Sequence, residues 1–267
     1  MRISKMMAVI LLCTIPAIAQ PFRSSQLISP DELFRRGMNA FAGSGPGRSD
    51  ASAVTDIERS AEQGYAPAQT VLGYLYENGI FVTSSPGQAL EWYRKAAKQG
   101  DGIAQYALGR ACFNAIWGDK TDGRKWLKSA SDQGNPFAQY LLGRALEERD
   151  YTSAPAEYRK AAEQGIPLAQ FRLGLLLKEG RGIPVNKPEA YAWLLLSFEA
   201  GVKGAEAPLR ELEGDLGSNG TEAAKTRARE MENSVLRSVN AHGCDDWQGE
   251  FDEIPTLPPP NLQRFCR

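Results

Sequence analysis

Two tyrosine–arginine pairs stand out among the residues that could recognise a ligand, because they recur at one spacing. Arg110 lies four residues after Tyr106, and Arg144 lies four residues after Tyr140. Tyr and Arg are enriched at the hot spots of protein interfaces, and a guanidinium group can hold a carboxylate through two parallel hydrogen bonds. The pairs predict recognition of acidic groups on a protein or peptide, although the tyrosines could equally pack between helices with the arginines stacked on them.

The sequence offers little for nucleophilic or metal chemistry. The single histidine is His242, which removes most metal-ligand clusters and confines any Ser/His or Cys/His pair to the C-terminal tail. A metal site there would be built from His242, Cys244, Asp245 and Cys266. We favour instead a disulfide between Cys244 and Cys266, because both lie in the same tail. No Gly-x-Ser-x-Gly, Ser-x-x-Lys or phosphate-binding glycine-rich loop occurs, so we expect no catalytic residue, no metal and no cofactor.

The first 19 residues have the features of a secretory signal peptide. Two basic residues precede an apolar stretch that is too short for a membrane span of roughly 20 residues, and Ala17-Ile18-Ala19 fits a small-x-small cleavage site. Cys13 allows lipoprotein processing as an alternative, but Leu12 precedes it where a small residue is expected. We expect an exported protein, periplasmic or secreted, in which residues 20–30 form a short extension before the fold.

The charge balance argues against two classes of partner. The chain has 31 Lys and Arg residues against 32 Asp and Glu residues, a net charge of −1. Proteins that bind nucleic acid or an anionic membrane surface usually carry a basic excess. The most apolar run after the leader, residues 190–198, is far too short to span a bilayer. We therefore expect no nucleic-acid partner and no stable membrane insertion.

Similar sequence segments recur through the middle of the chain. Four similar segments end in Gln-Gly, and their glycines are spaced by 36, 34 and 31 residues: 59–64, 95–100, 128–134 and 160–165. Each is followed by the frame Ala-Gln-x-x-Leu-Gly, at 68–73, 104–109, 138–143 and 169–174. A repeat period of this size is typical of α-solenoids, in which each unit contacts only its neighbours.

Each unit predicts two helices. In the first, apolar residues such as Ala68, Leu72 and Leu75 share one helical face. The second ends at a glycine such as Gly100, which suits the left-handed position that follows a helix. A glycine in the middle of the first helix, such as Gly73, costs about 1 kcal/mol of helix propensity relative to alanine. Its recurrence therefore predicts close contact with a neighbouring helix.

These units resemble Sel1-like repeats, which are helix hairpins related to tetratricopeptide repeats. The resemblance rests on segments such as 72–100 and 173–201 and covers about residues 31–212. It implies an all-α, right-handed solenoid of stacked antiparallel helix pairs. Two units depart from the family pattern: residues 110–134 lack the usual turn between the helices, and residues 144–165 are shortened there.

Two further segments follow the repeats. An amphipathic helix within residues 213–240, entered through a turn at 217–220, resembles the capping helices that close such arrays. The tail, residues 241–267, is rich in proline and acidic residues, and we expect it to be irregular and extended. Cys112 is predicted to be a buried thiol on an apolar helix, and Trp92, Trp126 and Trp193 are predicted to lie in the core.

The resemblance implies that the first helix of each unit lines a concave groove. Residues three before and one after each mid-helix glycine should then face the groove: Thr70, Tyr74, Tyr106, Arg110, Tyr140, Arg144, Phe171 and Leu175. The function that follows is a non-enzymatic adaptor or scaffold of the cell envelope that binds a protein or peptide partner.

Two alternatives stay open. One is an envelope hydrolase, or a β-lactam- or glycan-binding protein, similar to cysteine-rich Sel1-type relatives. Those relatives hold each repeat with a cysteine pair, which this chain lacks. The other is a regulator that blocks a partner enzyme with the tail as its inhibitory segment.

Overall fold

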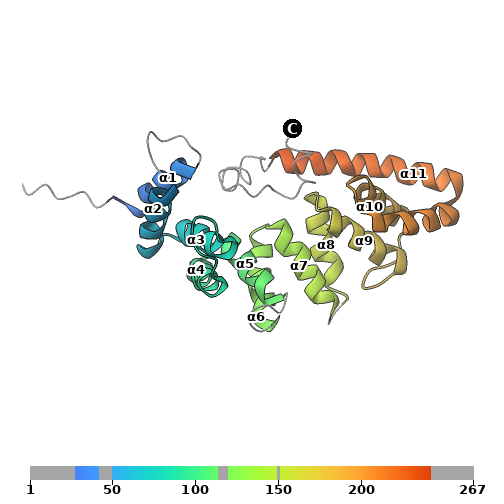
Figure 1. The fold of residues 1–267 in the computed structure, drawn as a ribbon. Coiled ribbons are helices and arrows are strands. Elements are labelled where there is room, and N and C mark those ends of the chain that lie inside the picture. The colour runs from blue at the N-terminus through green and yellow to red at the C-terminus, as the bar shows by residue number, and fades with distance from the viewer. Residues whose placement is uncertain (1–27, 42–49, 114–119, 149–150, 242–267) are drawn as a thin grey trace, which may run out of the picture.

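The structure, a computed structural model, describes residues 28–41, 50–113, 120–148 and 151–241, and all regular elements in these ranges are helical. The predicted fold class, an all-α solenoid of stacked antiparallel helix pairs, is confirmed (Figure 1). The helices are α1 (Pro30–Phe41), α2 (Asp50–Glu62), α3 (Ala66–Asn78), α4 (Pro86–Lys98), α5 (Gly102–Phe113), α6 (Lys120–Asp132), α7 (Pro136–Glu147), α8 (Ala154–Glu163), α9 (Pro167–Glu179), α10 (Lys187–Glu199), the 3-10 helix η1 (Lys203–Ala205) and α11 (Glu206–Ala241).

Several predictions fall outside these ranges. They concern the signal peptide (1–19), the possible metal site and the disulfide between Cys244 and Cys266, and they stay predictions.

The mid-helix glycines allow the two helices of each pair to approach closely, as predicted. A Cβ atom placed on Gly73 would lie 2.8 Å from the ring of Tyr93, and one on Gly109 would lie 2.6 Å from Leu127. Real Cβ atoms do not approach other atoms so closely, so no other residue fits without movement of α4 or α6. The same contact recurs in the remaining pairs, between Gly37 and Ile57, Gly143 and Tyr158, and Gly174 and Leu194.

The Gln-Gly segments end the second helices in the way the sequence predicts. Gly100 has a φ of 96°, its N–H bonds to the Ala97 carbonyl, and the next N–H, that of Asp101, bonds to the Ala96 carbonyl. This pattern is the Schellman motif, which satisfies carbonyl groups that the helix end would leave unpaired. The equivalent glycines also have positive φ: Gly64, Gly134, Gly165 and Gly201. The turn therefore passes the chain from each pair to the next in a similar way.

A ladder of glutamine side chains ties these turns to the first helices. In each Ala-Gln-x-x-Leu-Gly frame, the glutamine Nε2 donates to a carbonyl of the preceding helix, as in the 3.0 Å bond from Gln69 to Ala61. In the first three frames, the Oε1 of this glutamine accepts from the glutamine of the following Gln-Gly segment. We call each such pair a rung, and the three rungs have Nε2–Oε1 distances of 2.8, 2.8 and 2.7 Å: Gln69–Gln99, Gln105–Gln133 and Gln139–Gln164.

The last long helix closes the array. α11 is broken at Gly217, whose φ of 64° and ψ of 179° are not helical, and its second part runs back over α10 toward α8 (Figure 1). Leu209 and Leu212 from its first part, and Ala224 and Ala228 from its second, join one apolar core with α8, α9 and α10. The sequence predicted a turn over residues 217–220, but only Gly217 leaves the helix, because residues 218–220 already have helical geometry.

Two core predictions need correction. Cys112 is half-buried rather than buried, because it lies in the last turn of α5. Of the three tryptophans, Trp193 is buried, whereas Trp92 and Trp126 are only half-buried. The ring of Trp92 instead lies under Lys95, whose Nζ is 3.7 Å from the ring centroid.

Candidate protein-binding surface

The helix pairs form an arc, with α3 and α5 on its inner side and α4 and α6 on its outer side (Figure 1). We call the surface made by the eight predicted groove residues the inner face. Seven of them are half-buried: Tyr74, Tyr106, Arg110, Tyr140, Arg144, Phe171 and Leu175. Half-burial leaves part of each side chain accessible while neighbouring helices fix the rest, which suits a pre-organised contact surface.

Thr70 differs from the other predicted residues. It is 6% exposed, and its Oγ1 is buried without a hydrogen-bond partner in the described part of the chain. The prediction that Thr70 faces an open groove is therefore wrong, because the side chain is enclosed by the packed helices around α3.

The first tyrosine–arginine pair is already engaged with an acidic residue of its own chain. Arg110 on α5 forms an ion pair with Glu77 on α3, and the Glu77 carboxylate also accepts a 2.8 Å hydrogen bond from the Tyr93 hydroxyl. The guanidinium carbon of Arg110 lies 5.9 Å from the centre of the Tyr106 ring. The arginine lies over its tyrosine, as the packing interpretation expects, and its carboxylate partner belongs to the same chain. Recognition of a partner's carboxylate stays a prediction.

The second pair is arranged differently. The guanidinium of Arg144 on α7 lies 5.1 Å from the ring of Phe113, at the end of α5, and no described carboxylate pairs with it. Tyr140 instead packs against Tyr158, with ring centroids 6.0 Å apart. The two arginines are therefore not equivalent: Arg144 retains a cation over an aromatic ring, whereas the charge of Arg110 is balanced within the chain.

The tyrosines around these arginines are hydrogen-bond donors rather than bases. Burial raises the pKa of the Tyr93 hydroxyl far above its ordinary value, and the Glu77 carboxylate raises it further. Tyr158 is shifted in the same direction by burial and by its hydrogen bond to Glu147. Burial also raises the pKa of Tyr106, although Arg110 opposes the shift. All three remain protonated near pH 7, so none is poised for general base catalysis.

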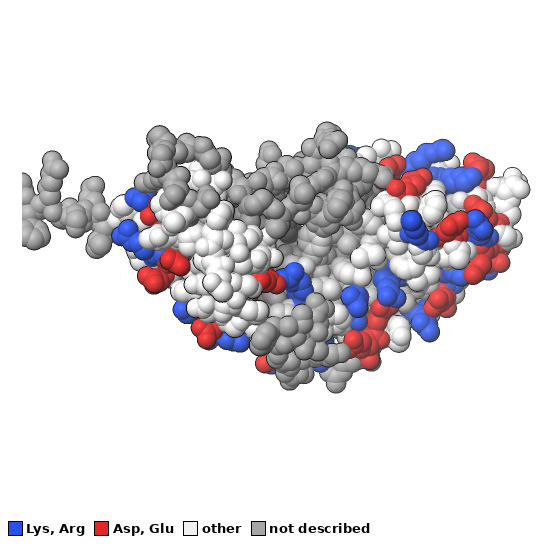
Figure 2. Space-filling model, in the orientation of Figure 1, with Lys and Arg blue, Asp and Glu red and all other residues white. Residues whose placement is uncertain are grey.

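Charges of both signs lie close together on the face drawn in Figure 2. Lys, Arg, Asp and Glu are interspersed along the outer edge of the arc and over α10 and α11, and much of the surface over α3 is uncharged. Within the described ranges, no three His, Cys, Asp or Glu side chains gather in a way that could hold a metal ion. Nor is any helix in that part of the chain both long and apolar enough to cross a bilayer. The described residues thus offer recognition by shape, aromatic contact and paired charge.

Three functional candidates were missed in the sequence: Glu77, Tyr93 and Phe113. Glu77 lies 33 residues before its partner Arg110, and Tyr93 follows Glu77 by 16 residues. The repeat period was a usable signal for Glu77, because a residue one unit away lies on the neighbouring first helix. Phe113 had no such signal, since its contact with Arg144 depends on how far α5 extends before the chain turns.

Comparison with known proteins gives a consistent answer. Residues 66–101, 102–135, 158–166 and 167–202 match the Sel1 repeat family model. The crystal structure of a Sel1 repeat protein from Oxalobacter formigenes is 39% identical, with a TM-score of 0.59, over 69% of this chain and 56% of that one. The structure of c5321, described as a protective antigen of uropathogenic Escherichia coli with an SLR fold, is 26% identical, with a TM-score of 0.67, over 86% of this chain and 50% of that one.

A curated protein also matches over a short stretch. The chitin synthase regulator SKT5 of Malassezia restricta is 41% identical over 61 residues, which are 23% of this chain and 4% of that protein. The chain thus spans about half of each of the two structures and a small part of SKT5.

Proposed function

Because the chain is a Sel1-like repeat protein, we propose that it is a non-enzymatic adaptor or scaffold of the cell envelope that binds a protein or peptide through the inner face. The observation that carries the proposal is the state of Arg144. Its guanidinium is held over Phe113, beside the half-buried Tyr140, and no described carboxylate neutralises it. A cation fixed in this way favours an acidic group on the partner.

The envelope part of the proposal depends on the sequence of residues 1–19, which has the composition of a secretory signal peptide. The adaptor part is supported by the fold, since stacked helix pairs present an extended surface over several units. A short match to a protein named as a regulator of chitin synthase is in keeping with an interaction module.

The test uses three purified variants beside the wild-type chain. The first is the double variant Arg110→Ala/Arg144→Ala. The second is the control Arg210→Ala, which removes an arginine on α11 that is 75% exposed and paired with Glu206. Each protein is immobilised, exposed to envelope extract of the producing cell and analysed by quantitative mass spectrometry. Circular dichroism checks that all are folded. A third variant, Arg144→Ala alone, shows which arginine carries the effect.

We expect a partner that wild type and Arg210→Ala retain equally and that the double variant loses by about tenfold or more, as for the loss of one or two charge-assisted hydrogen bonds. Arg144→Ala alone should account for most of the loss, because Arg110 is neutralised by Glu77. Equal retention by the double variant would overturn the placement on the inner face. Retention of no protein by wild type would count against an adaptor.

A further inference from the structure

The glutamine ladder lacks one side chain at its C-terminal end. Gln170 on α9 donates Nε2 to the Ala162 carbonyl at 3.3 Å, as its counterparts do in the other units. Its Oε1 should then accept from the residue before Gly201. That residue is Ala200, where the other three units have Gln99, Gln133 or Gln164. The fourth rung, Gln170–Ala200, is therefore incomplete.

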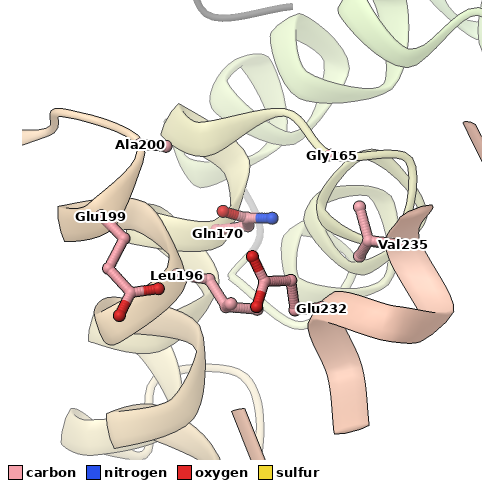
Figure 3. A pocket seen from close by; sticks show the side chains of 7 residues that line it. All are labelled: Gly165, Gln170, Leu196, Glu199, Ala200, Glu232 and Val235. Carbon is pink, nitrogen blue, oxygen red and sulfur yellow. The ribbon is translucent and has the colours of Figure 1, made fainter. Parts of the chain in front are cut away.

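A small cavity lies where the missing side chain would be. It has a volume of about 20 Å³, and Figure 3 shows Gln170 at its centre, with Glu232 and Val235 approaching from α11. Its lining residues are Gly165, Gln170, Leu196, Glu199, Ala200, Glu232 and Val235. We call this cavity the notch. It coincides with the missing rung rather than with an arbitrary packing defect, since both Gln170 and Ala200 line it.

The notch contains an acceptor, the Oε1 of Gln170, to which no described group donates. The residue as a whole is 5% exposed. In two of the complete rungs, the incoming glutamine donates both to this Oε1 and to a glycine carbonyl: Gln133 to Gln105 and Gly100, and Gln164 to Gln139 and Gly134. Gly165 supplies the equivalent carbonyl at the notch. The other units therefore show which kind of group belongs here, namely an N–H donor.

The charge around the notch selects among such donors. Its charged lining residues, Glu199 and Glu232, are both acidic, and Figure 3 shows the Glu232 carboxylate beside the Gln170 side chain. A protonated amine donates hydrogen bonds and balances the Glu232 carboxylate, whereas a neutral amide only donates. The amide oxygen of Gln170 and the carboxylate of Glu232 together favour a cation.

The size and the walls of the notch narrow the choice further. About 20 Å³ of the notch is open to the centre of a water-sized group, which is enough to admit a compact ammonium group. Leu196 and Val235 are 7% and 4% exposed and supply apolar walls on two sides. Such walls suit the methylene stem of a lysine, which packs against apolar surface while its charged end makes polar contacts.

We propose that the notch binds the ammonium group of a lysine side chain on the protein partner, held by the Gln170 Oε1, the Gly165 carbonyl and the Glu232 carboxylate. The proposal rests on the proposed function only in that a partner must supply the lysine. The notch itself, formed by the turn between α8 and α9 and by α9, α10 and α11, does not include the arginines of the inner face.

The experiment has two stages, and the first uses a small probe. Nα-acetyl-lysine-N-methylamide is titrated into the full chain labelled with nitrogen-15, and the side-chain amide signal of Gln170 is followed by NMR. The matched probe is the norleucine compound, which has the same stem without the ammonium group. We expect a saturable shift with the lysine probe at millimolar concentration, and none with norleucine.

Three variants test the chemistry of the notch. Ala200→Gln should complete the rung and abolish the shift, and it should fold, because Ala200 has φ −78° and ψ 1° where Gln99 has −85° and −2°. Glu232→Gln should weaken binding about tenfold. Gln164→Ala opens a similar space between Gln139 and Gly134 without Glu199 and Glu232. In this variant the side-chain amide signal of Gln139 should shift with the probe no more than that of Gln170 does in Glu232→Gln.

The second stage separates this proposal from the proposed function. The Arg110→Ala/Arg144→Ala variant should retain the probe shift even if it captures no partner, and Ala200→Gln should lower partner capture while the inner face is intact. A wild-type chain that shows no lysine-dependent shift, with only a water in the notch of a crystal structure, would overturn the proposal. So would a partner captured equally by wild type and Ala200→Gln, whatever the behaviour of the inner face.

Discussion

The three complete rungs of the glutamine ladder and the incomplete fourth rung are made from almost the same sequence. The fourth lacks one glutamine side chain, and the notch lies in its place. At Gln139–Gln164, the two amides bond at 2.7 Å. At Gln170–Ala200, the backbone is similar but three side-chain groups beyond the Cβ are missing, and α11 covers the site without filling it. A repeat protein thus reveals its special positions by departures from its own pattern, because the other units supply an internal reference.

The test with the largest expected effect removes the glutamine of the Ala-Gln-x-x-Leu-Gly frame, once from a complete rung and once from the incomplete one. Gln139→Leu should lower the free energy of unfolding by about 2–4 kcal/mol, because the Ser131 carbonyl loses its donor and the Gln164 amide loses one of its two acceptors. Gln170→Leu should cost about 1–2 kcal/mol, since only the bond to the Ala162 carbonyl is lost. Urea denaturation followed by circular dichroism measures both, and equal losses would show that the fourth rung is no weaker than the others.

A second test converts a complete rung into an incomplete one. Gln164→Ala removes the donations to Gln139 and to the Gly134 carbonyl, at 2.7 and 3.1 Å. We expect a loss of about 1–2 kcal/mol, less than for Gln139→Leu, because Gln164 is only half-buried and water can reach part of the space that it leaves. The same denaturation assay applies. A variant as stable as wild type would mean that the glutamine pairs contribute nothing to the complete rungs.

The smallest expected effect comes from completing the fourth rung. Ala200→Gln should stabilise the protein by about 1 kcal/mol, the typical net value of a hydrogen bond, and raise the melting temperature by about 2–4 °C. Ala200→Glu is the matched control, since it has nearly the same shape but brings an acceptor toward the Gln170 Oε1. Differential scanning calorimetry measures both variants. A gain with Glu as large as the gain with Gln would point to filled space rather than to the hydrogen bond.

Much of the fold was predictable because its determinants are local. The left-handed conformation of Gly100 and the need for a residue without a Cβ at Gly73 both follow from short sequence phrases. The same short sequence segments contain both glutamines of every complete rung. Their hydrogen bonds were not predicted, because the sequence gives their recurrence but not the direction in which the side chains point. The absence of glutamine at position 200 was a visible signal, and it gains meaning only once the other rungs are known.

The candidate surface was less predictable, because its contacts cross from one unit to another. Arg110 and Arg144 are equivalent in the sequence pattern, because each lies one residue after the mid-helix glycine of its unit. Their surroundings differ because Glu77 is present on α3, whereas Phe113 supplies an aromatic ring beside Arg144. Such differences depend on which residues of one unit contact the next. A sequence pattern that all units share therefore cannot predict them.

The break at Gly217 has a consequence for how this protein can change its length. Because both parts of α11 share one core with α8, α9 and α10, another helix pair added after α10 would have to displace α11 from apolar surface that it now covers. Tandem duplication, the usual route by which repeat arrays grow, is therefore disfavoured at this end. Insertion of a whole unit between α4 and α5, or between α6 and α7, meets no such obstacle, because each of those turns already joins one helix pair to the next.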